Sequence, residues 1–259
     1  MTAFVVATVA LLGLVVGSFL NVVIYRVPVG ESVVSPRSRC PGCGESIAER
    51  DNIPVLSWLI LRGRCRSCGE PISIRYPLVE LGHALLWLVM LAQFELTWEL
   101  PAFLYLASVG LALAMIDLDT KRLPNALTLP SYVVGAVLLL LPALFDDQWD
   151  DYLRAGLGMV ALYGFYFVLA LIYPKGMGWG DVKLAGVLGL YLGWLGWGSL
   201  VVGGFLGFLL GALIGGGLML VRRAGRKTKI PFGPFMLAGA LLAIVWGQQW
   251  WDLYLDTLA

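Results

Sequence analysis

Two aspartates are the residues of this chain whose setting most suggests chemistry. Asp181 follows the glycine-rich stretch Gly176–Gly180 and begins an apolar segment, whereas Asp117 ends an earlier one. Placing an ionisable group at a membrane boundary costs free energy, so such a residue is taken by default as a candidate functional residue. Two carboxylates from different helices at one depth can share a proton and activate a water molecule. The alternative is a pair of solvated interfacial aspartates.

Asp119 competes with Asp117 for this role. The two residues are separated by Leu118 only, and at about 100° per residue their side chains point to nearly opposite sides of a helix. Only one of them can therefore face Asp181. The residue pattern by itself leaves open which one does.

The four cysteines form two Cys-x-x-Cys pairs in the polar, proline-containing segment 28–77. Each such turn can hold two thiolates on one edge of a tetrahedron, and two turns complete a closed four-sulfur zinc site. A loop of this size scarcely folds alone, so the metal would supply much of its stability. Two disulfides or four free thiols are the alternatives. The predicted ligands are Cys40, Cys43, Cys65 and Cys68.

The composition predicts a polytopic membrane protein. Of 259 residues, 59% are hydrophobic and only 14% are charged, against roughly 25% charged in soluble domains. The first apolar run has neither a basic start nor a cleavage site, so we expect a retained helix rather than a signal peptide. We expect an all-α fold of about eight transmembrane helices. The expected segments are 4–27, 78–94, 101–116, 125–145, 155–173, 181–195, 197–221 and 232–250.

The basic residues predict the orientation. All but one of the 18 Lys and Arg residues lie in or beside 28–77, 117–124, 174–180 and 222–231, and Arg154 is the exception. By the positive-inside rule these connections are cytoplasmic and both termini lie outside. The two aspartates and the cysteines then share the cytoplasmic face, a reducing compartment that favours zinc over disulfides.

Two further features concern helix packing and rival catalysts. Four glycines recur every four residues in the segment 197–221 and predict one smooth ridge for close helix contact. His83 is the only histidine, which argues against a Ser-His-Asp triad. We interpret His83 and Glu80, one turn apart, as a polar pair between packed helices.

Taken together, these residues resemble a known family, the bacterial type IV prepilin peptidases, which are GxGD aspartic peptidases and N-methyltransferases. The resemblance covers almost the whole chain, and its motifs occur in the family's order and spacing. The motifs are Gly17–Asn21, Tyr25–Pro28, both cysteine pairs, Asn52–Trp58, Arg75–Leu81, Ile116–Asp119, Leu123–Asn125, Gly178–Leu184 and Pro231–Pro234.

The resemblance implies removal of a short basic leader from prepilins or pseudopilins after a glycine. It also implies methylation of the new amino terminus from S-adenosylmethionine, in the inner membrane. The catalytic pair carries over to Asp117 and Asp181, and Glu80 lies where methyl transfer is expected. Residues expected to line the site are Gly178, Gly180, Lys183, Asp119, Pro231, Phe232, Gly233 and Pro234.

The expected organisation is a first part, 1–95, with two helices and the zinc loop, followed by a peptidase core, 96–259. Expected partners are prepilin amino-terminal segments and the lipid bilayer, with no nucleic acid. One rival is a peptidase without methyltransferase activity. Another is a proton-coupled transporter, whose inverted repeat is not evident in the sequence.

Overall fold

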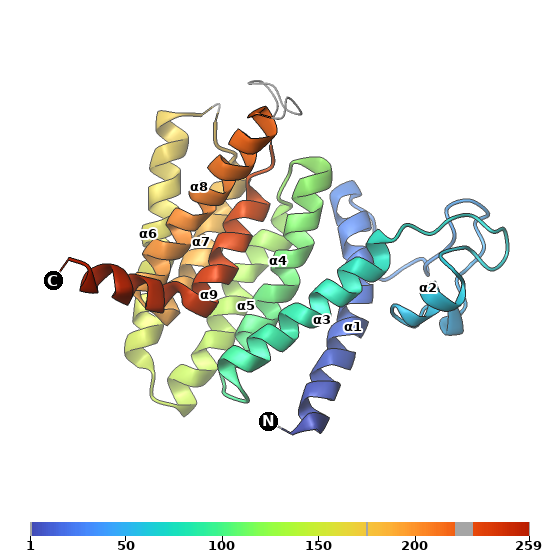
Figure 1. The fold of residues 1–259 in the computed structure, drawn as a ribbon, viewed down its shortest axis with the longest axis horizontal. Coiled ribbons are helices and arrows are strands. Elements are labelled where there is room, and N and C mark those ends of the chain that lie inside the picture. The colour runs from blue at the N-terminus through green and yellow to red at the C-terminus, as the bar shows by residue number, and fades with distance from the viewer. Residues whose placement is uncertain (1, 175, 221–229, 259) are drawn as a thin grey trace. The chain divides into compact units, whose positions relative to one another are not determined.

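The computed structural model describes residues 2–174, 176–220 and 230–258, and the long elements there are all helices. Each expected apolar segment forms a helix. Their bounds are α1 Ala3–Arg26, α3 Arg75–Phe94, α4 Leu100–Thr120, α5 Asn125–Phe145, α6 Trp149–Ile172, α7 Trp179–Leu195, α8 Trp197–Leu220 and α9 Gly233–Asp256 (Figure 1). The basic stretch Arg222–Lys229 of the last expected cytoplasmic connection lies outside the described residues. The all-α prediction is confirmed.

Six helices in the described ranges are long and apolar enough to cross a membrane, namely α1, α3, α4, α5, α6 and α8. The other two segments fall short for visible reasons. Helix α7 has 17 residues, fewer than the ~20 of a typical span. Helix α9 carries Gln248, Gln249 and Asp252 in its second half. The fold is thus that of a multi-pass membrane protein.

The chain divides into two units, which we describe separately: 1–96 with 107–112, and 97–106 with 113–259. In the first unit α1 packs along α3. Glycines allow this close approach, because a methyl group added to Gly13 would lie 2.8 Å from the Cα of Ala84, and one on Gly17 would lie 2.9 Å from the Cα of Glu80. The segment between α1 and α3 contains the short helices η1 (Val27–Val29), η2 (Glu49–Asp51) and α2 (Leu56–Ile60).

His83 closes a hydrogen-bonded chain inside the first unit. Its Nδ1 lies 2.6 Å from the Gly13 carbonyl oxygen, which can only accept, so Nδ1 donates and Nε2 accepts from the Ser108 hydroxyl at 2.8 Å. The Trp87 indole N–H donates to the same hydroxyl at 3.0 Å. The packing role expected of His83 is thus correct, but its partners are Gly13 and Ser108 rather than Glu80.

The second unit is built around α7, which packs against α5, α6, α8 and α9 (Figure 1). From Val182 to Trp194 nearly every residue of α7 is buried. Helix α6 comes close enough that a methyl group on Gly158 would lie 2.6 Å from the Gly189 carbonyl oxygen. The predicted glycine ridge of α8 faces α9, where a methyl group on Gly207 would lie 3.3 Å from the Cα of Met236.

Arg154, the exception to the charge pattern, is bound to the far end of α7. Its guanidinium donates to the carbonyl oxygens of Gly193 at 2.8 Å and Trp194 at 2.6 Å, and it pairs with Asp151. The last carbonyls of a helix have no partner within the helix, and a cation there also complements the helix dipole. Arg154 therefore caps the helix that begins with the Asp181 segment.

Candidate active site and metal centre

Asp117 is a buried carboxylate in the last turn of α4, with 4% of the residue exposed. Its Oδ2 accepts a hydrogen bond of 3.0 Å from the backbone N–H of Gly233, the first residue of α9. Asp119, in contrast, is exposed. The two side chains diverge as helical geometry requires, and the buried one meets the Pro231–Pro234 turn.

Asp181 lies in the first turn of α7, partly buried. Its Oδ2 accepts a hydrogen bond of 3.0 Å from the backbone N–H of Gly178, the residue that caps the helix. A carboxylate at this position satisfies one of the N–H groups that have no partner at a helix start. The backbone of the Gly178–Asp181 stretch thus orients the Asp181 carboxylate.

Asp117 and Asp181 both lie in the second unit, and Leu123 connects their surroundings, because methyl groups added to Gly180 and Gly233 would lie 3.0 and 3.3 Å from its side chain. Each carboxylate is held through Oδ2 by a glycine N–H. Within the part of the chain that the structure describes, neither Oδ1 makes a hydrogen bond. A carboxylate oxygen left open in this way can bind a water molecule, as a catalytic acid or base requires.

The turns that precede α5, α7 and α9 contact one another next to the two aspartates. Leu123 contacts Gly180, because a methyl group added there would lie 3.0 Å from the Leu123 Cβ. Lys183 donates from Nζ to Asn125 Oδ1 at 2.9 Å, linking α7 to the start of α5. The Phe232 ring joins an aromatic cluster, with its centroid 5.2 Å from that of Phe208.

The four cysteines meet as the sequence predicts. All four Sγ atoms lie within 4.8 Å of one another, and Sγ of Cys40 is 3.7 Å from Sγ of Cys68. Tetrahedral zinc with bonds of about 2.3 Å separates its sulfurs by a similar distance. N–H groups of Cys68 and Ser67 lower the pKa of the Cys65 thiol to about 7, which favours the thiolate that binds metal. The donor set therefore fits a four-coordinate metal ion.

The two cysteine turns are copies of each other. Residues Arg39–Ile47 and Arg64–Ile72 share the pattern Arg-Cys-x-x-Cys-Gly-Glu-x-Ile. In each copy the first Cys N–H donates to the Glu carbonyl oxygen, and the glycine N–H donates back to the first Cys carbonyl. Gly44 and Gly69 have φ of 72° and 75°, a region that favours glycine. Sequence analysis noted the cysteine pairs but missed this longer repeat, which is visible in the letters.

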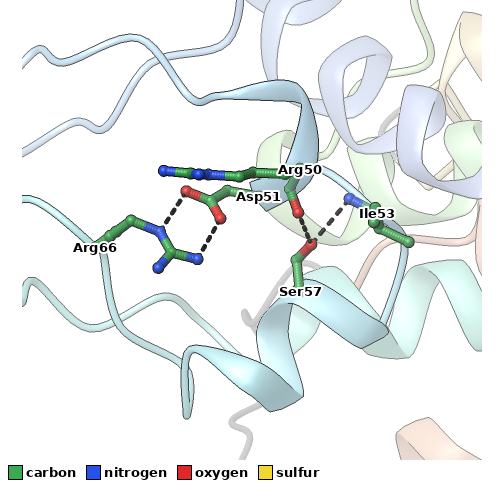
Figure 2. Close-up of polar contacts among 5 residues, drawn as sticks. All are labelled: Arg50, Asp51, Ile53, Ser57 and Arg66. Atoms are coloured by element: carbon green, nitrogen blue, oxygen red, sulfur yellow. Dashed lines mark hydrogen bonds and ion pairs between the residues drawn. The ribbon is translucent and has the colours of Figure 1, made fainter.

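An ion pair joins the second cysteine turn to the preceding short helix, η2 (Figure 2). Arg66 donates to both oxygens of Asp51, at 2.8 and 2.7 Å. Hydrogen bonding from Arg66 lowers the pKa of the Asp51 carboxyl. Beside it, the Ser57 hydroxyl donates to the Arg50 carbonyl and accepts from the Ile53 N–H (Figure 2). The segment 50–57 is thereby fixed to the cysteine turns.

Glu80 holds the end of this segment. Its Oε2 accepts a 2.7 Å hydrogen bond from the N–H of Val55, and only 7% of the residue is exposed. Val55 has φ 61°, a backbone conformation that is an outlier for a β-branched residue. Such strain persists only where the surroundings enforce it, and it gathers at functional sites.

Comparison with known proteins gives two family matches. Residues 11–94 match the bacterial peptidase A24 N-terminal domain, and residues 104–220 match the type IV leader peptidase family. A prepilin leader peptidase/N-methyltransferase of Stutzerimonas stutzeri is 37% identical, over 95% of this chain and 92% of that protein.

The chain belongs to the type IV leader peptidase family.

Further relatives with the same name support this membership. One from Aeromonas hydrophila is 40% identical over 92% of this chain and 90% of the relative, and one from Pseudomonas aeruginosa is 38% identical over 98% and 94%. No solved structure matches the chain. In this member of the leader peptidase family, the first matched region contains the four cysteines and the second contains the two aspartates.

Proposed function

We propose that the protein is an aspartic endopeptidase that removes the basic leader from type IV prepilins or pseudopilins. The observation that carries the proposal is the arrangement of Asp117 and Asp181, two carboxylates that are each oriented by a glycine N–H and whose helices both border Leu123. Family membership supplies the substrate class, because the relatives are named prepilin leader peptidases.

The chemistry follows from the two carboxylates. Two close carboxylates do not readily ionise together, so one carries a proton and the other does not. The ionised group takes a proton from a bound water, whose oxygen attacks the peptide carbonyl carbon. As the water oxygen adds, the protonated group gives its proton to the carbonyl oxygen. The group that took the water proton then gives it to the amide nitrogen as the C–N bond breaks, and the intermediate returns a proton to the other carboxylate. No covalent bond to the enzyme forms, in keeping with a histidine that is fully engaged in packing.

The substrate's two halves match the proposed membrane boundary. A prepilin presents a basic leader followed by an apolar helix, and we place the site at the cytoplasmic face of the inner membrane, as the distribution of basic residues predicts. The apolar part can then stay in the bilayer while the leader remains in water. We place the leader's basic residues beside the exposed end of α4, where Asp119 lies.

We propose in addition that the enzyme methylates the new amino terminus from S-adenosylmethionine, as the relatives' names imply. Glu80 is our candidate residue for this step. It is buried and fixes a strained loop residue, Val55, and a carboxylate can both attract a sulfonium group and accept the proton that an ammonium must lose. The four cysteines, holding zinc, would give this loop its shape.

Site-directed variants test both activities. Asp117→Asn and Asp181→Asn should each abolish leader cleavage in an inserted, folded protein, and Asp119→Asn should retain it. Full activity in either of the first two would refute the dyad. Glu80→Gln should give a cleaved product that lacks the added methyl group. The mass of the processed amino terminus, measured with and without S-adenosylmethionine, reports both leader cleavage and methylation. An unmethylated product from the unmodified enzyme would leave a peptidase without methyltransferase activity.

A further inference from the structure

Leu123, in the turn between α4 and α5, contacts the first turns of both α7 and α9. A methyl group added to Gly180 would lie 3.0 Å from Leu123 Cβ and 3.4 Å from its Cδ1. One added to Gly233 would lie 3.3 Å from Leu123 Cδ2 and 2.8 Å from Asp117 Oδ2. A single isobutyl group therefore fills the space between the two glycines and borders the Asp117 carboxylate.

The turn that carries Leu123 is fixed at both ends. On the α4 side, the Lys121 N–H donates to the Asp117 carbonyl oxygen at 2.8 Å. On the α5 side, Asn125 accepts from Lys183 Nζ at 2.9 Å. Lys183 is itself held, because its carbonyl oxygen accepts a 2.6 Å hydrogen bond from the Tyr132 hydroxyl. Tied in this way to the helices of both aspartates, Leu123 is a wall of the site.

This wall restricts the residue that supplies the scissile carbonyl. That carbonyl carbon must reach the water between Asp117 and Asp181. The Cα atom of the same residue is bonded to the carbonyl carbon, and any Cβ atom is only one bond further, so both must enter the site with it. The space beside the Asp117 carboxylate is already occupied by Leu123. A glycine adds no atoms there, whereas each further side-chain carbon must displace the leucine.

We propose that Leu123 sets the upper size limit for the substrate side chain on the carbonyl side of the scissile bond. The inference rests on the proposed peptidase function, and it makes Leu123 a specificity-determining residue that takes no part in proton transfer. A difference of one methylene in an apolar pocket changes selectivity by about 10- to 200-fold. Truncating Leu123 should therefore relax selectivity by about tenfold or more.

The test compares four full-length purified enzymes: unmodified, Leu123→Ala, Leu123→Phe and Leu129→Ala. Leu129, which lies on α5 and is 48% exposed, provides the matched control for a leucine truncation. Each enzyme receives synthetic prepilin peptides with Gly, Ala or Val as the residue that supplies the scissile carbonyl. Mass spectrometry of the released leader gives kcat/KM for each peptide. The decisive quantity is the ratio of the Ala peptide to the Gly peptide.

We expect this ratio to rise about tenfold or more in Leu123→Ala, to fall in Leu123→Phe, and to stay unchanged in Leu129→Ala. An unchanged ratio in a Leu123→Ala enzyme that still cleaves the Gly peptide overturns the inference and leaves the peptidase function standing. Failure of the unmodified enzyme to cleave any peptide overturns the proposed function itself. If Leu123→Ala does not fold in detergent, Leu123→Val takes its place, and an unchanged ratio there refutes the inference equally.

Discussion

Replacing Gly233 by alanine tests whether the active-site geometry depends on a backbone contact. The added methyl group would lie 2.8 Å from Asp117 Oδ2, well inside the 3.5–4.0 Å at which non-bonded atoms attract best. The carboxylate must therefore move by roughly 0.7 Å or more. The same carboxylate receives its hydrogen bond from the N–H of Gly233, so the movement weakens the contact that orients it.

The size of the effect follows from this displacement. A misplacement of about 1 Å can cost roughly 100-fold in rate, so we expect Gly233→Ala to lower kcat by about 10- to 100-fold, equivalent to about 1.4–2.7 kcal/mol of activation free energy. KM should change less, because the substrate's apolar helix binds away from the carboxylate. Overpacking should also lower stability by about 1–3 kcal/mol.

A leader-cleavage assay with purified enzyme separates these effects. The matched control is Gly164→Ala in α6, where an added methyl group meets no atom within 4 Å. It should retain full activity, and it should be slightly more stable because alanine favours a helix by about 1 kcal/mol over glycine. A folded Gly233→Ala enzyme with unchanged kcat would show that the Gly233 contact does not orient Asp117 for catalysis, and the argument from backbone geometry would fail.

Three further predictions concern the metal and two ion pairs. Purified protein should contain one zinc with sulfur ligands at about 2.3 Å by X-ray absorption, and Cys40→Ser should lose it; metal-free wild-type protein would reject the site. Arg66 lowers the pKa of Asp51 below its ordinary value of 3.8, so the ion pair stabilises the loop above pH 3.8 and this stabilisation is lost as the pH falls below it. The hydrogen-exchange rate of residues 49–57 should therefore rise at low pH in the unmodified protein. The rate in the Asp51→Asn variant should not change with pH in this way. Arg154→Ala should lower the free energy of unfolding by about 1–3 kcal/mol, because it leaves buried carbonyl groups unpaired. Arg37→Ala removes an exposed ion pair and should change the free energy of unfolding little.

Much of the candidate site could be predicted from the sequence because its parts are local. The Gly178–Asp181 hydrogen bond spans one helical turn, and each cysteine turn closes on itself. Helical geometry also limited the partner of Asp181 to one of Asp117 and Asp119. Choosing between these two from the residues alone was impossible, because the choice depends on which face of α4 meets α9.

Contacts between distant segments were beyond the sequence pattern. Nothing local shows that the Gly233 N–H orients Asp117, or that Leu123 lies on two glycines. Arg154 stood out only as an exception to the charge rule, and its role as a cap of α7 requires knowing that α6 and α7 are neighbours. The expected His83–Glu80 pair was wrong because both side chains had stronger partners elsewhere in the first unit.

The glycine N–H groups that orient both aspartates have a consequence for how this enzyme can diverge. A main-chain donor survives every substitution except proline, so evolution cannot remove it by exchanging one side chain for another. Neighbouring side chains such as Leu123, in contrast, are free to vary under selection by different substrates. Descendants of this chain can therefore change what they cleave without rebuilding how they cleave it.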